Sequence, residues 1–234
     1  MGVLLNTRQP LSLPRFPFRG KELEGCVLYA SLWDEKSRVS PFPSLDPNHH
    51  LLTVTGAIWT PPTGYVFDGN DYIKNSTANW RSSDQSGTFV IWSKQTVNGA
   101  LFGSCDEATD SHQFFMHVAT GFQVGVAIAG VASFVTGNTS LVDGLWHCCA
   151  WVSNGTVWTM FVDNIPQTLT LGAGTNDGQW LGDVANRDNF SIGARLRLSA
   201  TYYTGSVGEV LYYNRALTAS EILMIYEKTK WRYV

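Results

Sequence analysis

A histidine followed by two cysteines, His147-Cys148-Cys149, is the stretch whose residue types best suit a metal site or a catalytic thiol. The surrounding residues 146–153 alternate as a β-strand does, so the two cysteines point to opposite faces and cannot bind one ion together. A zinc site also needs ligands spaced by two to four residues, and no other candidate lies nearby in the sequence. We therefore predict that this stretch belongs to a structural core.

The other histidines that could bind a metal form two pairs. His49 and His50 lie in a polar stretch before an apolar run, which is typical of a turn. His112 and His117 are five residues apart, so in one strand they would face opposite sides. We predict turn and surface histidines rather than metal ligands.

Catalytic motifs are missing from the sequence. A retaining glycosidase needs two carboxylates about 5 Å apart, which a strand supplies through an alternating run of acidic residues. Glu209 stands alone in its apolar run, and Asp106, Glu107 and Asp110 lie in a Ser/Thr-rich loop. There is no G-x-S-x-G, phosphate-loop or zinc-protease motif either. We expect a protein that is not an enzyme.

Binding a sugar without catalysis requires aromatic platforms and a few polar groups on loops. Four aromatic residues in polar, loop-like stretches are candidates for this role: Trp80, Trp180, Tyr202 and Tyr203. The alternative for each is that a large aromatic side chain fills a gap at the end of a β-sandwich.

The composition limits the classes of protein to which the chain can belong. It has 234 residues, of which 44% are hydrophobic and 15% charged, with a net charge of −3. Low charge with many glycines and aromatics favours strands and turns, and a single β domain of this length is common. The acidic balance argues against nucleic acid as a partner, and no apolar run is long enough to span a membrane. The four cysteines (26, 105, 148 and 149) are expected to be free thiols.

Short apolar runs separated by turn residues predict the strands of an antiparallel sandwich. The predicted strands share alternating or continuous apolar patterns: 27–32, 51–56, 88–94, 100–104, 112–119, 122–128, 146–153, 156–163, 189–194 and 205–214. Asn154-Gly155 predicts a hairpin with a type I′ turn. Thr218-Ala-Ser-Glu221 is a capping box, and the apolar spacing after it predicts one helix over about 218–229.

The first 25 residues differ from the rest and are predicted to form an extended arm outside a domain of residues 26–234. Prolines at positions 10, 14 and 17 alternate with the apolar residues Leu11, Leu13, Phe16 and Phe18. Such a segment is stiff and forms no core by itself. Two interpretations stay open: an arm that docks on a neighbouring subunit, and a strap that lies over its own domain.

Three segments resemble the concanavalin A-like lectin/glucanase superfamily, in its laminin-G-like branch. They are GAIWTPPTGYVFDGNDYIKN (56–75), GLWHCCAWVSNGTVWTMFVDN (144–164) and FSIGARLRLSATYYTGSVGEVLYYNRALTASEI (190–222). They occur in the family's order and at roughly its spacing, and cover residues 26–227. The resemblance implies an all-β, two-sheet antiparallel jelly-roll sandwich with one short C-terminal helix.

The same resemblance implies a structural calcium ion. Many relatives carry one near the loop that matches residues 67–72, completed by acidic residues of the strand that matches 207–210. The corresponding ligands in this sequence are Asp68, Asp71 and Glu209. Gly208 replaces an aspartate of the family pattern, so one ligand is missing. No other cofactor is expected.

We expect no secretory signal peptide, because prolines and arginines interrupt the short N-terminal apolar run, and we expect the cysteines to suit folding in a reducing cytosol. With the N-terminal arm, these features favour a non-enzymatic virion structural protein: a capsid-decoration, fibre or tail-surface component of a phage or virus. The arm would bind other virion subunits or copies of the chain, and the jelly roll would face outward and bind glycans. The alternative is a secreted carbohydrate-binding module or adhesin domain, which would act outside the cell.

Overall fold

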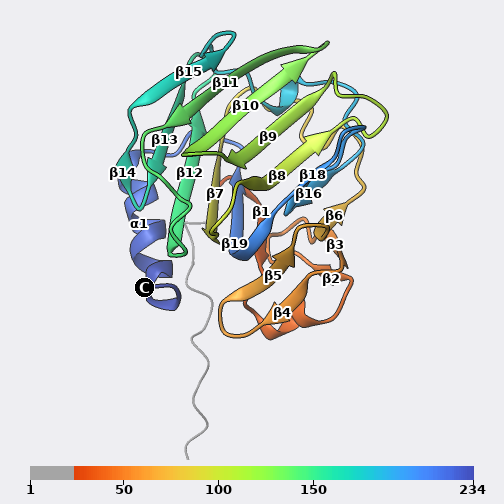
Figure 1. Cartoon of the computed structure of the whole chain (residues 1–234), viewed down its shortest axis with the longest axis vertical. Coiled ribbons are helices and arrows are strands. Elements are labelled where there is room, and N and C mark those ends of the chain that lie inside the picture. Colours follow the sequence, from red (N-terminus) through yellow and green to blue (C-terminus); the bar gives the residue numbers. More distant parts are fainter. Residues whose placement is uncertain (1–23) are drawn as a thin grey trace, which may run out of the picture.

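The computed structural model describes residues 24–234, which fold into two antiparallel sheets packed face to face (Figure 1). The eight-stranded sheet has a central path in this spatial order: β14 (Ile165–Pro166), β13 (Trp158–Val162), β12 (Trp146–Ser153), β7 (Gly87–Lys94), β19 (Thr204–Tyr213), β5 (Gly64–Asp68) and β4 (Ile58–Thr60). Its eighth strand, β1 (Cys26–Ser31), also pairs with β19. This sheet contains β19, the last strand before the C-terminal helix.

The nine-stranded sheet lies opposite. Its order is β15 (Leu169–Ala173), β11 (Val131–Gly137), β10 (Phe122–Ile128), β9 (Gln113–Val118), β8 (Gly99–Cys105), β16 (Phe190–Ile192), β6 (Tyr72–Asn75), β3 (Leu51–Thr55) and β2 (Phe42–Pro43). A small hairpin of β17 (Ala194–Arg195) and β18 (Thr201–Tyr202) lies beside β8. Within residues 24–234 the helical elements are η2 (Glu35–Arg38), η3 (Leu181–Asp183), α1 (Ala219–Thr229) and η4 (Lys230–Arg232).

The main core fills the space between the sheets because each strand alternates apolar side chains toward it. On β9, Phe114 and Met116 point into this core, where Phe114 stacks on Trp151 of β12 with ring centroids 4.4 Å apart. A second apolar cluster lies on the other face of the eight-stranded sheet, beneath α1. Trp92 of β7 anchors it by donating its indole N–H to Thr229 at 2.8 Å.

The predicted fold class is confirmed: the protein is an all-β sandwich with one short C-terminal helix. Thr218 caps α1 and exchanges hydrogen bonds with Glu221, as the capping box requires. Several strands were not predicted, among them β5, β6, β11 and β15. The residues of β11 and β15 are polar or exposed at many positions, which hides the apolar pattern. Asn154-Gly155 does join two strands, but in a longer loop. Only Gly155 has a positive φ, so the type I′ prediction was wrong.

In the described part of the chain, no helix is both long and apolar enough to cross a membrane.

Candidate functional site

Three of the four aromatic residues predicted to bind sugar are buried in the core, which corrects that prediction. Trp180 and Tyr203 have no exposed surface and Trp80 has 3%. Trp80 packs on Phe190 with centroids 4.3 Å apart, so a sugar ring has no access to its face. They fill gaps in the sandwich, which is the alternative that their size favoured. Tyr202 remains half-buried on β18.

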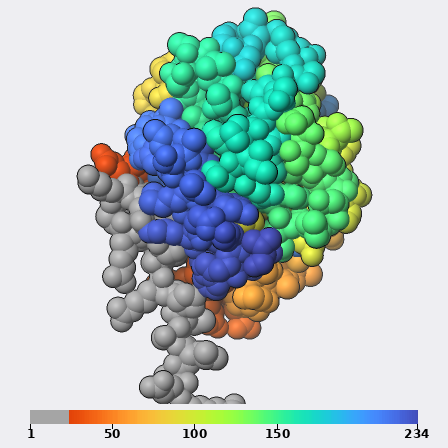
Figure 2. All heavy atoms as spheres, turned by 90° about the vertical axis from the view of Figure 1, so that its left-hand side faces the viewer, coloured from red at the N-terminus to blue at the C-terminus, as the bar shows by residue number. Residues whose placement is uncertain are grey.

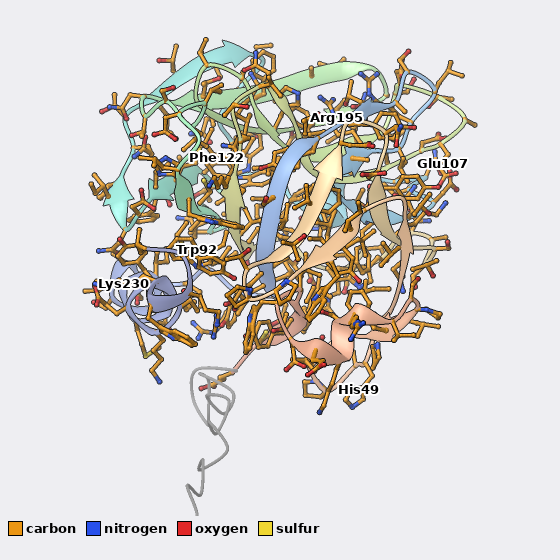
Figure 3. The ribbon with its side chains drawn as sticks, turned by 60° about the horizontal axis from the view of Figure 1, so that its bottom comes forward. His49, Trp92, Glu107, Phe122, Arg195 and Lys230 are labelled. Atoms are coloured by element: carbon orange, nitrogen blue, oxygen red, sulfur yellow. The ribbon has the colours of Figure 1, made fainter. Side chains whose placement is uncertain are left out.

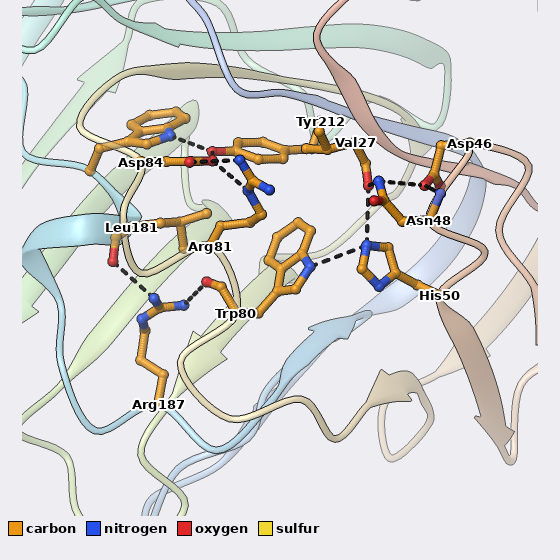
Figure 4. Close-up of polar contacts among 11 residues, drawn as sticks. Val27, Asp46, Asn48, His50, Trp80, Arg81, Asp84, Leu181, Arg187 and Tyr212 are labelled. Atoms are coloured by element: carbon orange, nitrogen blue, oxygen red, sulfur yellow. Dashed lines mark hydrogen bonds and ion pairs between the residues drawn. The ribbon is translucent and has the colours of Figure 1, made fainter.

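The polar neighbours of Trp80 are themselves part of this packing (Figure 4). Asp84 accepts a 2.7 Å hydrogen bond from Tyr212, whose hydroxyl in turn accepts the indole N–H of Trp180 at 3.0 Å. The fully buried Arg187 donates to the carbonyl oxygen of Trp80 at 2.9 Å. The polar residues near these tryptophans therefore form hydrogen bonds with buried polar groups instead of facing solvent.

The structure does not bring the three predicted calcium ligands together. Asp71 accepts the backbone N–H of Asp68 at 2.9 Å, so these two share one turn. Thr204 pairs with Asp68, which places Glu209 five residues further along β19, about 17 Å away. Glu209 is fully buried and forms an ion pair with Arg232 instead. No group of three His, Cys, Asp or Glu side chains among residues 24–234 is arranged to hold a metal.

His147-Cys148-Cys149 is structural, as predicted. Cys148 points into the cluster beneath α1 and Cys149 into the main core, and both are free thiols. His147 lies between two carboxylates: its Nδ1 is 2.7 Å from Asp163 and its Nε2 is 3.1 Å from Asp143. The hydrogen bond with Asp163 is the main reason why the pKa of His147 is raised.

The four arm residues Leu11, Leu13, Phe16 and Phe18 lie outside the described residues, so their assembly role stays a prediction.

A different set of residues forms a polar site on the outer face of the nine-stranded sheet. Strand alternation on β9 turns Gln113, Phe115 and His117 outward. Arg195 of β17 lies over them, with its guanidinium carbon 3.9 Å from the centroid of the Phe115 ring and a hydrogen bond to Gln113. We call these four residues the Arg195 face.

The backbone of β17 can approach β8 this closely because position 103 is glycine. A Cβ at Gly103 would lie 2.8 Å from the Cα of Arg195 and from the carbonyl oxygen of Ala194. The loop that follows is fixed by Asp110, which pairs with Arg197 at 2.7 Å and accepts the N–H of Ser199 at 3.0 Å. The position of Arg195 is therefore built into the fold.

Arg195 is a largely desolvated cation without a counter-ion. Arg197 has Asp110, but within residues 24–234 no carboxylate pairs with Arg195, and its Nε is buried without a hydrogen-bond partner. Desolvation lowers the pKa of Arg195 to about 10, so it stays charged at neutral pH. Burial and the two arginines lower the pKa of His117 to about 4, which keeps its imidazole neutral. The side chain of His117 also leaves Nδ1 unpaired.

This arrangement can bind an anion that also carries polar groups. An unpaired, partly buried charge is costly, and a bound carboxylate would offset that cost. Gln113 is already engaged, because its amide accepts from Arg195 and donates to the carbonyl oxygen of Asp110 at 2.6 Å, so it holds Arg195 in place. Neutral His117, whose Nδ1 is unpaired, is the group that can hydrogen-bond a hydroxyl next to the anion. Sequence analysis did not identify this site, because only the β17–β18 hairpin places Arg195 over β9. The one available signal was an arginine directly after a buried Phe-Ser-Ile-Gly-Ala strand.

The family model described as the concanavalin A-like lectin/glucanases superfamily matches residues 67–223, and the chain belongs to this superfamily. No curated protein matches the sequence.

Solved structures with the same fold include parts of sialidases. The CBM40 domain of the Ruminococcus gnavus IT-sialidase, bound to α2,3-sialyllactose, superposes with a TM-score of 0.57 at 14% identity, covering 74% of this chain and 97% of that one. A mutant Trypanosoma rangeli sialidase with trans-sialidase activity gives a TM-score of 0.64 at 18% identity. This match covers 90% of our chain but 34% of the enzyme. At these identities the likeness concerns the fold.

Proposed function

We propose that this protein is a non-catalytic carbohydrate-binding domain that recognises an acidic glycan at the Arg195 face. The observation that carries the proposal is the guanidinium of Arg195, which packs on Phe115 without a carboxylate partner in the described chain. A sugar carboxylate would supply that partner through charge-assisted hydrogen bonds. His117 would bind a neighbouring hydroxyl group, while Gln113 holds the guanidinium of Arg195 in position.

Two further observations support this assignment. A structure with the same fold, the R. gnavus CBM40 domain, is bound to sialyllactose, a glycan whose sialic acid bears a carboxylate. The nearest carboxylate in the loop beside the Arg195 face, Asp110, is engaged by Arg197 and Ser199. A glycosidase of the usual type would need two free carboxylates flanking the bond.

This proposal corresponds to the carbohydrate-binding alternative of the sequence analysis rather than to its main interpretation. The likeness to sialidase-associated binding modules favours glycan binding. The main interpretation, a protein on a virion surface with residues 1–25 as the assembly arm, is supported by the sequence pattern alone. Deleting residues 1–25 tests it: an arm required for assembly predicts a folded domain that no longer joins a particle.

Calorimetric titration with sialyllactose and with lactose tests the glycan proposal, because lactose lacks the carboxylate. We expect binding of sialyllactose, and an affinity about tenfold lower in Arg195→Gln, which corresponds to one lost charge-assisted interaction. Lys94→Gln is the matched control, since it removes one exposed positive charge elsewhere. Circular dichroism establishes that the variants are folded. Equal affinity for the two sugars, or an Arg195→Gln variant that binds like the wild type, would refute the proposal.

A further inference from the structure

A pocket that shares no residue with the Arg195 face contains three tryptophans. Its volume is about 390 Å³, within the size range of small-molecule sites. Its lining comes from three separate parts of the chain: Trp33, Asp34, Glu35, Trp59, Pro61, Pro62, Trp231 and Arg232. Figure 2 shows the dark-blue C-terminal residues beside the orange segment that includes the β4–β5 hairpin. We call this the tryptophan pocket.

Two of the three indole rings of the tryptophan pocket have their N–H groups turned toward the backbone. Trp59 donates its N–H to the carbonyl oxygen of Leu32 at 3.0 Å, and Trp231 donates to that of Lys228 at 3.0 Å. Trp59 is half-buried, while Trp231 is 52% exposed. Since these two indole nitrogens are satisfied within the protein, both rings offer apolar surface to a ligand. The indole nitrogen of Trp33 is buried without a hydrogen-bond partner.

The innermost lining residue is an arginine whose charge is already balanced. The guanidinium carbon of Arg232 lies 3.8 Å from the ring centroid of Trp33 and 4.6 Å from that of Trp231. Its Nη1 forms an ion pair with the buried Glu209, while its side chain is 2% exposed. Nε and Nη2 have no hydrogen-bond partner. Both nitrogens are buried beneath the indole rings, so Arg232 gives the pocket an occupied, charge-balanced floor instead of a free positive charge.

Two features together restrict the class of ligand. The indole faces favour a flat apolar surface, and the carboxylates of Asp34 and Glu35 favour hydroxyl donors. The guanidinium of Arg232 already packs on Trp33 and Trp231 and would repel an organic cation, while Asp34 and Glu35 would repel an anion. A pyranose ring has C–H faces together with hydroxyls that both donate and accept.

We propose that the tryptophan pocket is a second carbohydrate-binding site, specific for an uncharged sugar residue. It is separate from the Arg195 face. Figure 3 labels Arg195 in the upper part of the molecule and Lys230, the neighbour of Trp231, at its left side. This inference goes beyond the proposed function, because it adds a site of different chemistry, and either site can fail without the other.

Nuclear magnetic resonance of the indole N–H groups tests the proposal on the full-length protein. We would titrate glucose, galactose, mannose and N-acetylglucosamine at millimolar concentrations and follow the signals of Trp59 and Trp231, assigned with single variants. At least one sugar is expected to shift both signals. Trp231→Ala should weaken its binding about tenfold, and Trp231→Phe should retain most of the affinity. Val131→Ala, which removes exposed apolar surface on β11 away from the pocket, is the control.

Several results would overturn the proposal. One is the absence of a shift with all four sugars. Another is unchanged sugar binding in Trp231→Ala, provided that its circular dichroism matches the wild type. Tetramethylammonium, or a synthetic peptide of residues 8–18, could shift the same signals while the sugars do not. The pocket would then bind a cation or the N-terminal segment instead. Arg195→Gln should leave the sugar-induced shifts of the indole N–H signals unaltered. The proposal for the Arg195 face and the proposal for the tryptophan pocket can therefore fail independently.

Discussion

At the scale of single residues, the buried pair of Glu209 and Arg232 connects the core with the tryptophan pocket. Glu209 has no exposed surface and accepts a 2.9 Å hydrogen bond from Tyr29. Desolvation raises the pKa of Glu209, and the Arg232 guanidinium opposes that rise. The resemblance predicted a metal ligand at this position. Its actual partner is an arginine contributed by the last residues of the chain.

We expect Glu209→Gln to lower the free energy of unfolding by about 3–5 kcal/mol, because it leaves the Arg232 charge buried without a partner. Urea denaturation measures this loss. The double variant Glu209→Leu/Arg232→Met removes both charges and should recover much of the stability. A single variant as stable as the wild type, or a double variant as unstable as Glu209→Gln, would contradict this account.

The four cysteines allow a second prediction at the residue scale. All are buried and free, and desolvation raises the pKa of Cys26 and Cys105 to about 12 and those of Cys148 and Cys149 well above the usual value. Because the thiolate is the reactive form, the native protein should react very slowly with iodoacetamide at pH 8. Mass spectrometry should find four modified cysteines after denaturation. Rapid modification of the native protein would show that a thiol is accessible.

At the scale of elements, His147 joins the loop before β12 to the turn after β13. Its ring lies between Asp143 and Asp163, and Asp163 also accepts the N–H of Cys148 at 2.9 Å. Asp163 has a positive φ of 50°, so the turn adopts a strained conformation that these contacts hold in place. The histidine thus helps to fix the hairpin that covers one edge of the eight-stranded sheet.

The raised pKa of His147 predicts a dependence of stability on pH. A group whose pKa is higher in the folded state stabilises the protein fully below its unfolded pKa, near 6.5, and this contribution is lost as the pH rises through the folded value. We therefore expect His147→Gln to cost about 1 kcal/mol more at pH 6 than at pH 9. Denaturation of both proteins at the two pH values measures the difference. An equal cost at both would mean that charged His147 contributes nothing.

At the scale of the whole molecule, the sandwich separates two candidate sites of different chemistry. The Arg195 face belongs to the nine-stranded sheet. The tryptophan pocket is formed by the end of β1, the β4–β5 hairpin and η4. One site offers an unpaired positive charge, and the other offers aromatic surface with balanced charges. A glycan that carries both an acidic and a neutral sugar would have two chemically distinct contacts with this domain.

The different chemistry of the two sites predicts different responses to salt. Binding of sialyllactose at the Arg195 face should weaken severalfold when the NaCl concentration rises to about 1 M, because salt screens the interaction between the two charges. Binding of a neutral sugar at the tryptophan pocket should change little. Calorimetry for the first ligand and indole N–H shifts for the second give both dependences. A parallel loss at both sites would indicate a general effect of salt on the fold.

The sequence was informative where structure depends on neighbouring residues. Alternation over 146–153 placed Cys148 and Cys149 on opposite sides of a strand, and the Thr218–Glu221 pattern located the start of α1. It was misleading for Trp80, whose polar neighbours suggested an exposed loop. The partner that buries this ring is Phe190, more than a hundred residues later, and local composition carries no information about that contact.

The sequence by itself determined the sandwich, its C-terminal helix and its superfamily, because alternation, capping and the family segments act over short distances along the chain. Only the tertiary structure decided which polar and aromatic residues face a ligand. Arg195 gains its role from a glycine on another strand that lets its backbone approach, and the tryptophan pocket joins residues from both ends of the domain. Such sites depend on distances between segments that are remote in sequence, and burial and charge pairing are settled only when those segments meet.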